Sequence, residues 1–410
     1  MSSDPLISTQ AAAALLGVKP TTVYTYVTRG HLESIKKTGS AASWFRQSEI
    51  ERFAARRRHR GEPTRGTGIA ETAITEIDGQ SYHYRGRRPD ALAREYSFEQ
   101  VAEFLWSGSV PTHISWRPRQ LDVSAAVSKV GLDGDALPLD RLRVAISALA
   151  ASDHLRFGRQ PAALAVTARQ LMADLVEALP LKAEAPTGDS IAARLWPRLC
   201  PNPASDEQVE ALDRALIIIA DHGVPPSTLA ARIAAGYQAD LYGAVQAGLS
   251  ILAGAWHGGR ALSAEDMLEE IEQVGDAELV VGELYRKGAI PCLGQPRYAG
   301  EDPRTSLIVD ILEATVPGHD VVHAFREIRR IVDERALPAP SVELALAAFA
   351  QAFGFTKGGS EAVFAIGRSA GWIAHAIEVY AQPQPPSPEF SYVGVSADAK
   401  PDPLETLSRS

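Results

Sequence analysis

Three polar segments interrupt an otherwise helical sequence, and each carries a side chain that can act on a small anion. His222 stands in the first, His257 in the second, and residues 291–304 form the third. Glycine or proline flanks the side chain each time and lets backbone amides approach a ligand. A single histidine is more often a core residue than a ligand, so the inference rests on the set. With Arg304 and Arg368, the two histidines predict a site for an anionic small molecule.

The elements that must position these residues are almost all helices. Alanine-rich segments with helical apolar spacing predict helices at 98–105, 139–152, 161–179, 206–221, 228–251, 264–274, 304–315, 321–335, 342–352 and 361–380. Before them, alternating apolar and polar residues around Asp78-Gly79 predict a β-hairpin at 73–86. The predicted fold class is mainly α.

Composition excludes several classes of protein. The 410 residues are 45% hydrophobic and 22% charged, which excludes a disordered or fibrous chain. Two cysteines, Cys200 and Cys292, are too few for a disulfide framework and fit a reducing compartment. No signal peptide is visible, and the longest apolar stretch, 241–256, is shorter than the ~18 residues of a membrane span. We expect a soluble, cytoplasmic protein with no membrane partner.

The net charge of −9 is divided unequally along the chain. Residues 1–66 have a balance of +6, whereas the remainder has a balance of −15. A small basic module on a large acidic body is consistent with an anionic partner for the module, or with a solvated arginine-rich helix.

The basic module has the pattern of a winged helix-turn-helix. Ser8 or Thr9 suits the N-cap of a helix over 12–16, and Pro20 suits the first turn of a second helix. Residues 35–46 predict a two-stranded wing, and residues 47–60 predict a basic helix. The segments 12–18, 22–32 and 45–50 resemble MerR-type and excisionase-type domains.

That resemblance implies contacts with DNA. Lys19, Thr21, Thr22 and Tyr26 would face bases or phosphates, and Arg46 would contact the DNA backbone. Helix-turn-helix modules also serve as protein docking units, so both partners stay open.

The rest of the chain resembles citrate synthase over residues 67–394. The motifs, in order, are Glu71-Thr-Ala-Ile, Ile77-Asp-Gly, Tyr84-Arg-Gly, Phe98-Glu-Gln-Val-Ala-Glu-Phe-Leu-Trp-Ser-Gly, Ala220-Asp-His-Gly, Trp256-His-Gly-Gly, Glu301-Asp-Pro-Arg and Gly371-Trp-Ile-Ala-His. Each motif is weak alone, but the ordered set is specific to the family.

The resemblance implies the domain organisation. Residues 1–60 would be the winged helix-turn-helix and 61–66 a linker. A large domain at 67–257 and 351–394 and a small domain at 258–350 would close over the site, and 395–410 would be a tail. The family also implies an obligate homodimer.

The resemblance also assigns roles to residues. His222, Arg304 and Arg368 would bind oxaloacetate or a related 2-oxoacid. His257 would stabilise the enol of acetyl-CoA or another acyl-CoA, which condenses with the oxoacid as in the tricarboxylic acid cycle. CoA would rest on Leu293, Gly294 and Arg297. The acyl-CoA is a substrate, and we expect neither a cofactor nor a metal.

Three positions depart from the family pattern. Gln295 replaces the histidine that polarises the oxaloacetate carbonyl, and Glu343 replaces the catalytic aspartate. Ser387 stands where an arginine normally reaches the neighbouring subunit's site. Glutamine still donates a hydrogen bond but exchanges no proton at neutral pH, and the extra methylene of Glu343 displaces the carboxylate by ~1.5 Å.

Three functions remain open from sequence. The first is a citrate synthase-type acyltransferase with a weakened or altered site. The second is a DNA-binding regulator that senses a di- or tricarboxylate such as citrate on a degenerate, non-catalytic site. The third is a modulatory subunit of a hetero-oligomer with a complete citrate synthase.

Overall fold

The computed structural model describes residues 5–16, 18, 20–28, 32, 34–36, 43–47, 50, 71–119, 123–132, 136–185, 188–255, 259–288, 290, 292–294, 297–298 and 300–382. The chain divides into two compact units, residues 1–69 with 387–410, and residues 70–386. The predicted linker at 61–66, the tail at 395–410 and Ser387 lie outside the described residues, and the other predicted domain boundaries stay predictions.

The N-terminal unit is a small helix-turn-helix with a three-stranded sheet. Its elements are β1 (Leu6–Ser8), α1 (Thr9–Leu16), α2 (Pro20–Thr28), β2 (Ile35–Lys36) and β3 (Ser43–Arg46). The antiparallel strand order is β1-β3-β2, so the predicted wing gains a third strand, β1, that the sequence pattern did not reveal. The Ser8 hydroxyl accepts a hydrogen bond from the Ala11 amide at 3.3 Å, which confirms Ser8 as a helix cap.

Val23 and Phe45 are fully buried in the core of this unit, together with Ala12, Ala13, Leu32 and Ile50. The winged helix-turn-helix is therefore confirmed as a fold. The predicted basic helix at 47–60 falls largely outside the described residues.

The second unit is almost entirely helical and confirms the predicted fold class. It begins with the predicted hairpin, β4 (Thr75–Ile77) and β5 (Tyr82–Tyr84). The helices are α4 (Pro89–Glu95), α5 (Phe98–Ser107), α6 (Val123–Ser128), α7 (Pro138–Ser152), α8 (Pro161–Glu177), α9 (Ile191–Leu199), α10 (Asp206–Ile219), α11 (Pro226–Gly236), α12 (Leu241–Leu252), α13 (Gly259–Val274), α14 (Ala277–Arg286), α15 (Pro303–Thr315), α16 (Asp320–Glu334), α17 (Val342–Ala352) and α18 (Gly359–Tyr380). No helix in the described ranges is both long and apolar enough to cross a membrane.

The helix predicted at 228–251 is wrong as a single element. Gln238 adopts a left-handed conformation with φ of 63°, which ends α11. The Asp240 side chain then accepts a hydrogen bond from the Gly243 amide at 2.8 Å and begins α12. The sequence pattern also missed α4, α6, α9 and α14.

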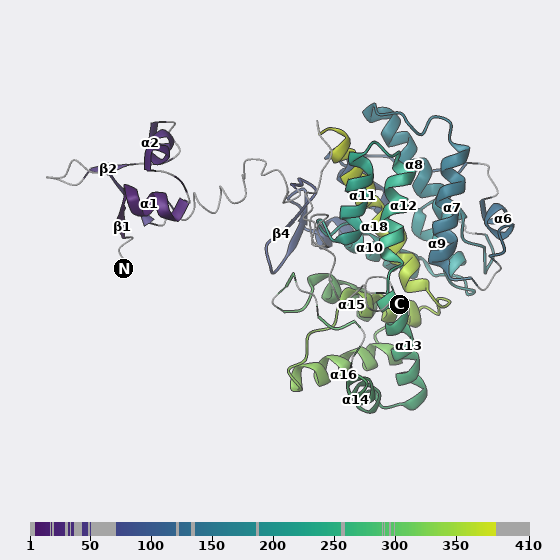
Figure 1. The fold of residues 1–410 in the computed structure, drawn as a ribbon. Coiled ribbons are helices and arrows are strands. Elements are labelled where there is room, and N and C mark those ends of the chain that lie inside the picture. Colours follow the sequence, from purple (N-terminus) through teal and green to yellow (C-terminus); the bar gives the residue numbers. More distant parts are fainter. Residues whose placement is uncertain are drawn as a thin grey trace, which may run out of the picture. The chain divides into compact units, whose positions relative to one another are not determined.

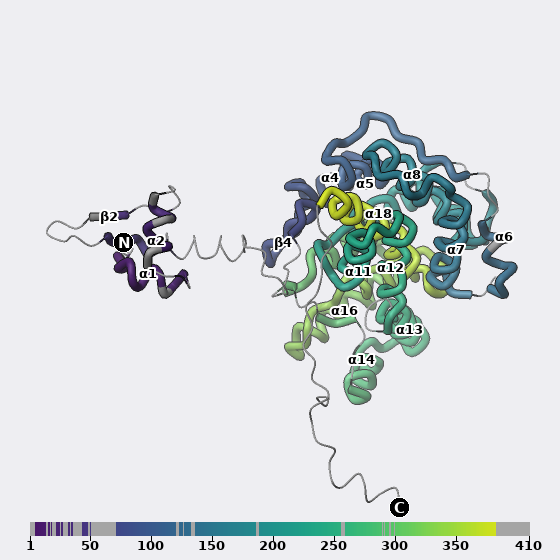
Figure 2. The backbone as a smooth tube through the Cα atoms, turned by 45° about the horizontal axis from the view of Figure 1, so that its top comes forward, coloured from purple at the N-terminus to yellow at the C-terminus, as the bar shows by residue number. Residues whose placement is uncertain are grey.

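Helix α18 lies at the centre of the unit and packs against α10, α11 and α12 (Figures 1 and 2). Glycines make these close approaches feasible. A Cβ at Gly248 would lie 2.5 Å from the Trp372 ring. A Cβ at Gly371 would collide with the Ala220 carbonyl and the Asp221 carboxylate. The Gly371 contact brings the polar segment after α10 directly onto α18.

Helices α13, α14, α15 and α16 gather on one side of the unit, below α7–α12 in Figure 1. Helix α13 packs on α14, α16 and α17, and α15 also reaches α10. These helices fall within the small domain predicted at 258–350, and that domain stays a prediction.

Candidate active site

The β-hairpin holds the segment that carries His222. The Tyr82 hydroxyl donates to the Ile218 carbonyl at 2.9 Å. The Tyr84 hydroxyl is 3.0 Å from the Asp221 carbonyl and accepts from the Asp221 amide at 3.1 Å. The Tyr82 ring lies edge-on to the His222 imidazole, with 5.8 Å between ring centroids. The alternation that predicted a hairpin thus supplies two buried tyrosines that fix the position of His222.

Asp221 anchors the same segment to α18. Its carboxylate accepts from Thr75 and from the Gly223 amide at 3.1 Å, and it lies 3.3 Å from Nε2 of His375. Burial opposes ionisation of Asp221, yet the His375 imidazole keeps the pKa of that carboxyl below its usual value. Burial likewise opposes protonation of His375, but Asp221 and Glu378 outweigh it and raise the pKa of His375.

His222 is a neutral hydrogen-bonding group. Its exposed fraction is 2%, and its Nε2 lies 2.6 Å from the Tyr298 hydroxyl. Burial, followed by the charges of Arg304, Arg368 and Arg297, lowers the pKa of His222 well below 6.5. At neutral pH the imidazole therefore carries no charge, and the guanidiniums supply the positive potential.

Two buried arginines face the same region. Arg304 pairs with Asp302 through Nε and Nη2, and both side chains are almost fully buried. Arg368 donates from Nε to the Ile219 carbonyl at 2.9 Å, but its buried Nη2 has no hydrogen-bond partner among the described residues. Burial and the Arg304 guanidinium lower the pKa of Arg368 to about 10, which still leaves it charged at neutral pH.

The third polar segment is held against the start of α17 by backbone pairing. The Gly294 amide donates to the Ala339 carbonyl at 2.7 Å, and the Ser341 amide donates to the Cys292 carbonyl at 2.9 Å. Gly294 has a φ of 79°, a conformation that glycine adopts without strain. The pairing brings Cys292 and Gly294 to the start of α17, whose first turn holds Glu343.

Glu343 lies half-buried in the first turn of α17, where the helix dipole favours a carboxylate. Its charge acts on Arg304 and Arg368, and it contributes to raising the pKa of Cys292 to about 12, for which burial is the main cause. The structure thus brings Glu343 and the two arginines within electrostatic range of one another. The other two predicted catalytic residues, His257 and Gln295, lie outside the described residues.

A cavity of about 570 Å³ lies beside the predicted CoA loop. It is lined by Ala255, Arg260, Ser263, Asp266, Met267, Glu270, Leu284, Ile290 and Cys292. Nη2 of Arg260 donates to the Leu293 carbonyl at 3.0 Å. Arg297 is exposed and donates to the Val224 carbonyl at 3.0 Å, so it lies next to the His222 segment.

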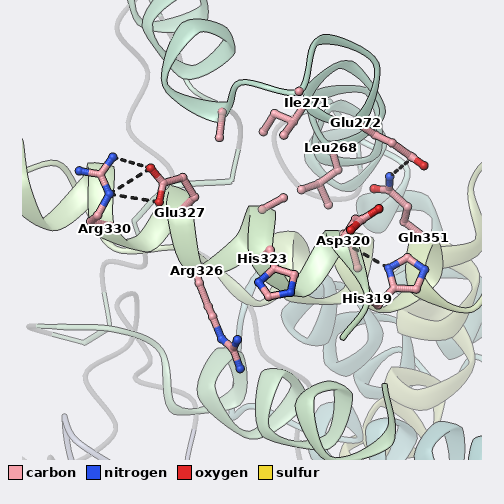
Figure 3. Close-up of a pocket in the computed structure, with 14 residues that line it drawn as sticks. Leu268, Ile271, Glu272, His319, Asp320, His323, Arg326, Glu327, Arg330 and Gln351 are labelled. Carbon is pink, nitrogen blue, oxygen red and sulfur yellow. Dashed lines mark hydrogen bonds and ion pairs between the residues drawn. The ribbon is translucent and has the colours of Figure 1, made fainter. Parts of the chain in front are cut away.

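A further cavity of about 660 Å³ lies between α13 and α16, and none of the predicted site residues lines it (Figure 3). Its lining carries three carboxylates, Glu272, Asp320 and Glu327, against two guanidiniums, Arg326 and Arg330, and Arg330 pairs with Glu327 (Figure 3). This balance gives no positive potential for an anion, so the cavity is not the carboxylate site.

The predicted DNA-contacting residues are described only in part. Thr21 lies within α2, Thr22 and Tyr26 are half-buried on that helix, and Arg46 is exposed at the end of β3. Lys19 lies outside the described residues.

The residues missed by sequence reasoning are those that support others. Tyr298 bonds to His222, Asp302 pairs with Arg304, and His375 lies against Asp221. Asp302 and His375 stand within motifs that were recognised, but no pattern distinguishes Tyr298 from other loop aromatics.

Comparisons with known proteins agree with the two-unit division. The family model for the citrate synthase C-terminal domain matches residues 63–385, and a helix-turn-helix domain model matches residues 6–58. Citrate synthase 2 of Bacillus subtilis is 28% identical over 359 residues, which cover 81% of this chain and 96% of that protein. A 2-methylcitrate synthase of Mycobacterium tuberculosis is 28% identical over 339 residues, covering 76% and 85%.

Solved structures show the same fold. Citrate synthase from Thermoplasma acidophilum, in a ternary complex with carboxymethyl coenzyme A and oxaloacetate, aligns with a TM-score of 0.71 at 23% identity. The alignment covers 83% of this chain and 97% of that one. Citrate synthase from Thermotoga maritima aligns with a TM-score of 0.66 at 24% identity, covering 84% and 98%.

Proposed function

The chain belongs to the citrate synthase family, and on that premise we propose that residues 70–386 condense an acyl-CoA with oxaloacetate or a related 2-oxoacid. The site departs from the family pattern at Gln295 and Glu343, so the proposed activity is weak or directed to an altered substrate. The proposal includes a cytoplasmic location for the protein and a reaction that needs no cofactor.

The observation that carries it is the buried Nη2 of Arg368, which bonds to no residue that the structure describes and lies within electrostatic range of a second guanidinium. Two buried cations, Arg304 and Arg368, repel each other, and an unmet buried donor costs roughly 1–3 kcal/mol. A ligand carboxylate would satisfy Nη2 and screen the repulsion. Nη1 of Arg304, which takes no part in the ion pair with Asp302, would donate to the same ligand. Neutral His222 adds a hydrogen bond without adding charge.

The chemistry would be a Claisen-type condensation. Glu343 would take a proton from the carbon next to the thioester carbonyl, and His257 would stabilise the resulting enol. The enol carbon would then form a bond to the ketone carbon of the oxoacid as the C=O π bond breaks, and the enol proton would return to His257. Gln295 would hold the resulting alkoxide by a hydrogen bond, and a water molecule would protonate it. Water would cleave the thioester and release the CoA thiol.

Two of these steps are compromised. A glutamine in place of an imidazole donor costs about a hundred- to a thousandfold in rate if its amide fails to replace that donor. A displaced base costs on the order of a further hundredfold. The two substitutions would compensate in part if the Gln295 amide holds the substrate in a shifted position and the longer Glu343 side chain reaches it there.

The acyl-CoA would lie in the 570 Å³ cavity beside Cys292, next to Leu293, whose carbonyl accepts a hydrogen bond from the lining residue Arg260. Apolar Met267, Leu284 and Ile290 suit the chain between thioester and nucleotide. Arg260 supplies a cation to a lining that also holds Asp266 and Glu270, so the CoA phosphates would lie outside the cavity.

A homodimer is the proposed assembly. Large apolar side chains are exposed along α11 and the neighbouring α12, with Leu229 at 43%, Ile233 at 39%, Tyr237 at 61% and Ile251 at 41%. Such a contiguous apolar face is typical of a surface covered by another chain. A second copy of this chain is the occupant that the family implies.

Release of CoA thiol tests the enzyme. Purified protein is supplied with oxaloacetate and acetyl- or propionyl-CoA, and wild type is compared with the double variant Gln295→His/Glu343→Asp. We expect slow release by wild type and a rise of about a hundredfold or more in the double variant. Arg214→Gln, which replaces a partly exposed arginine on α10, serves as the control and should match wild type. No turnover by wild type with any short acyl-CoA, together with turnover restored by the double variant, would exclude the wild-type enzyme.

A second candidate function is favoured by the helix-turn-helix match at residues 6–58. A chain that binds a tricarboxylate without turnover would act as a metabolite-sensing DNA-binding regulator, and a dimer would suit two half-sites one helical turn apart. The test is a salt titration of promoter-DNA binding with and without citrate. Arg46→Ala should weaken binding and lower the salt slope by about one, whereas Lys129→Ala on the acidic unit should not. Failure of any saturable DNA binding at low salt removes this candidate.

The third candidate function is that of a modulatory subunit in a hetero-oligomer. Co-purification of a complete citrate synthase chain at fixed stoichiometry would support it, and a homogeneous homodimer from the native source would count against it.

A further inference from the structure

A small cavity of about 190 Å³ opens between the start of α7, the end of α8, α9 and the residues before α18. Four basic side chains line it, Arg141, Lys182, Arg198 and Lys357, and no carboxylate does. The remaining lining is apolar or neutral. This concentration of positive charge lies in a part of the chain whose net charge is strongly negative.

Two members of the group are buried, Arg141 with 2% of its surface exposed and Arg198 with 7%. The contacts of Arg198 show an excess of positive charge. Its Nη1 donates to the Leu179 carbonyl at 2.8 Å, and its Nη2 pairs with Glu177. Its Nε is buried without a hydrogen-bond partner among the described residues. Glu177 also accepts from Arg194 at 3.4 Å, so one carboxylate serves two guanidiniums and leaves an excess of positive charge.

Lys182 and Lys357 differ in their surroundings. In the described part of the chain, no carboxylate lies within ion-pair distance of the half-buried Lys182. Lys357 instead faces acids on α13, with Asp266 at 2.7 Å and Glu269 at 3.0 Å. The unbalanced charge therefore lies on the side of the cavity formed by Arg198 and Lys182.

We propose that this cavity binds a small polyanion through a phosphate or diphosphate group. Arginine forks and a lysine point charge are the side chains that recognise phosphate oxygens. The volume is below the roughly 300–1,000 Å³ of pockets for drug-sized ligands, so the cavity suits the phosphate moiety rather than a whole nucleotide.

The cavity is separate from the carboxylate site. It borders the residues just before α18, and Arg368 stands ten residues beyond Gly358, the N-cap of that helix. At 1.5 Å per residue this places the two about 15 Å apart along the helix. None of the residues assigned to the oxoacid or to CoA lines the cavity.

Titration calorimetry with inorganic diphosphate on the full chain tests the proposal, at constant ionic strength. The variants are Lys182→Gln and Lys182→Glu, and the matched control is Lys129→Glu, an exposed charge reversal elsewhere in the same unit. The basic N-terminal unit and the CoA site are unchanged in all four proteins. Any diphosphate that they bind therefore contributes equally to each titration and cancels when the variants are compared. Melting temperatures without ligand establish that each variant folds.

We expect wild type and Lys129→Glu to bind diphosphate saturably, with equal affinity and equal stoichiometry. Lys182→Gln should weaken binding roughly tenfold, and Lys182→Glu more. Equal affinity in all four proteins, or no saturable binding to wild type, would overturn the proposal. A parallel titration with ADP identifies the source of the group: loss of ADP binding in Lys182→Glu indicates a nucleotide whose base stays outside, and diphosphate binding alone indicates the free anion.

Discussion

Nε2 of His222 lies 2.6 Å from the hydroxyl of Tyr298, and both side chains are buried. Burial raises the pKa of Tyr298 above its usual value, and burial with three nearby arginines lowers that of His222. Both groups are therefore neutral, and the phenol occupies the nitrogen that a bound oxoacid is expected to use. A ligand that reaches this nitrogen has to displace Tyr298.

Tyr298→Phe is predicted to strengthen oxaloacetate binding. The variant loses the competing hydrogen bond and leaves the buried imidazole nitrogen unmet until a ligand arrives. A hydrogen bond contributes about 0.5–1.5 kcal/mol net, so the dissociation constant should fall roughly two- to tenfold. Calorimetry measures it, with Tyr285→Phe, 64% exposed on α14, as control. Weaker binding would mean that Tyr298 contacts the ligand itself.

Arg368→Gln is predicted to abolish most carboxylate binding. The substitution removes the charge and the unpartnered Nη2 while keeping a side chain of similar length. Truncating one member of a buried charge pair costs about 2–5 kcal/mol, which is at least roughly thirtyfold in affinity for oxaloacetate. Arg214→Gln, whose ion pair with Glu210 is exposed, is the matched control and should bind as wild type does. Unchanged affinity in Arg368→Gln would remove the carboxylate site from this position.

Stability is predicted to fall on the acid side because of His222. Its pKa is lowered in the folded protein, so below about pH 6.5 the unfolded chain binds more protons than the folded one. The free energy of unfolding should then fall by roughly 1.4 kcal/mol per pH unit from this group, down to the folded pKa. The contribution of His375 to the free energy of unfolding has the opposite sign. Because its pKa is raised in the folded protein, it adds stability at low pH that is lost as the pH rises through the folded pKa.

The measurement is the melting temperature of wild type and His222→Asn between about pH 7.5 and pH 5.5. Because His375 is present in both proteins, its contribution cancels. Wild type should lose melting temperature relative to His222→Asn as the pH falls, whereas exposed His154→Asn should follow wild type. A constant difference between wild type and His222→Asn would show that the imidazole is not held neutral.

Much of the fold was predictable because its local signals are strong. The hairpin at Asp78-Gly79, the cap at Ser8 and most helices follow from turn chemistry and apolar spacing. The break between α11 and α12 was not, because a left-handed Gln238 has no sequence signature and the apolar spacing continues across it. Helices α4 and α6 were not predicted either, because six or seven residues are too few to show the helical spacing of apolar side chains.

The site was predictable as a set of residue types, but not as a set of contacts. His222, Arg304 and Arg368 were named from their motifs, and their convergence depends on Gly371, which lets the Asp221 segment approach α18. That Tyr298 bonds to His222 depends on how residues 292–294 pair with 339–341, a long-range contact that no local pattern encodes. Contacts between residues this far apart in the sequence form only in the folded chain.

Ile233→Glu is predicted to dissociate the proposed dimer. The side chain is 39% exposed on α11 between Leu229 and Tyr237, so a carboxylate there would be buried without a partner if a second copy covers this face. Leu279→Glu is the matched control, because Leu279 is 54% exposed on α14, outside the apolar face. Light scattering after size-exclusion chromatography should give a dimer for wild type and Leu279→Glu, and a monomer for Ile233→Glu. A dimeric Ile233→Glu at low micromolar concentration would show that α11 lies outside the interface, and the apolar face would then need another partner.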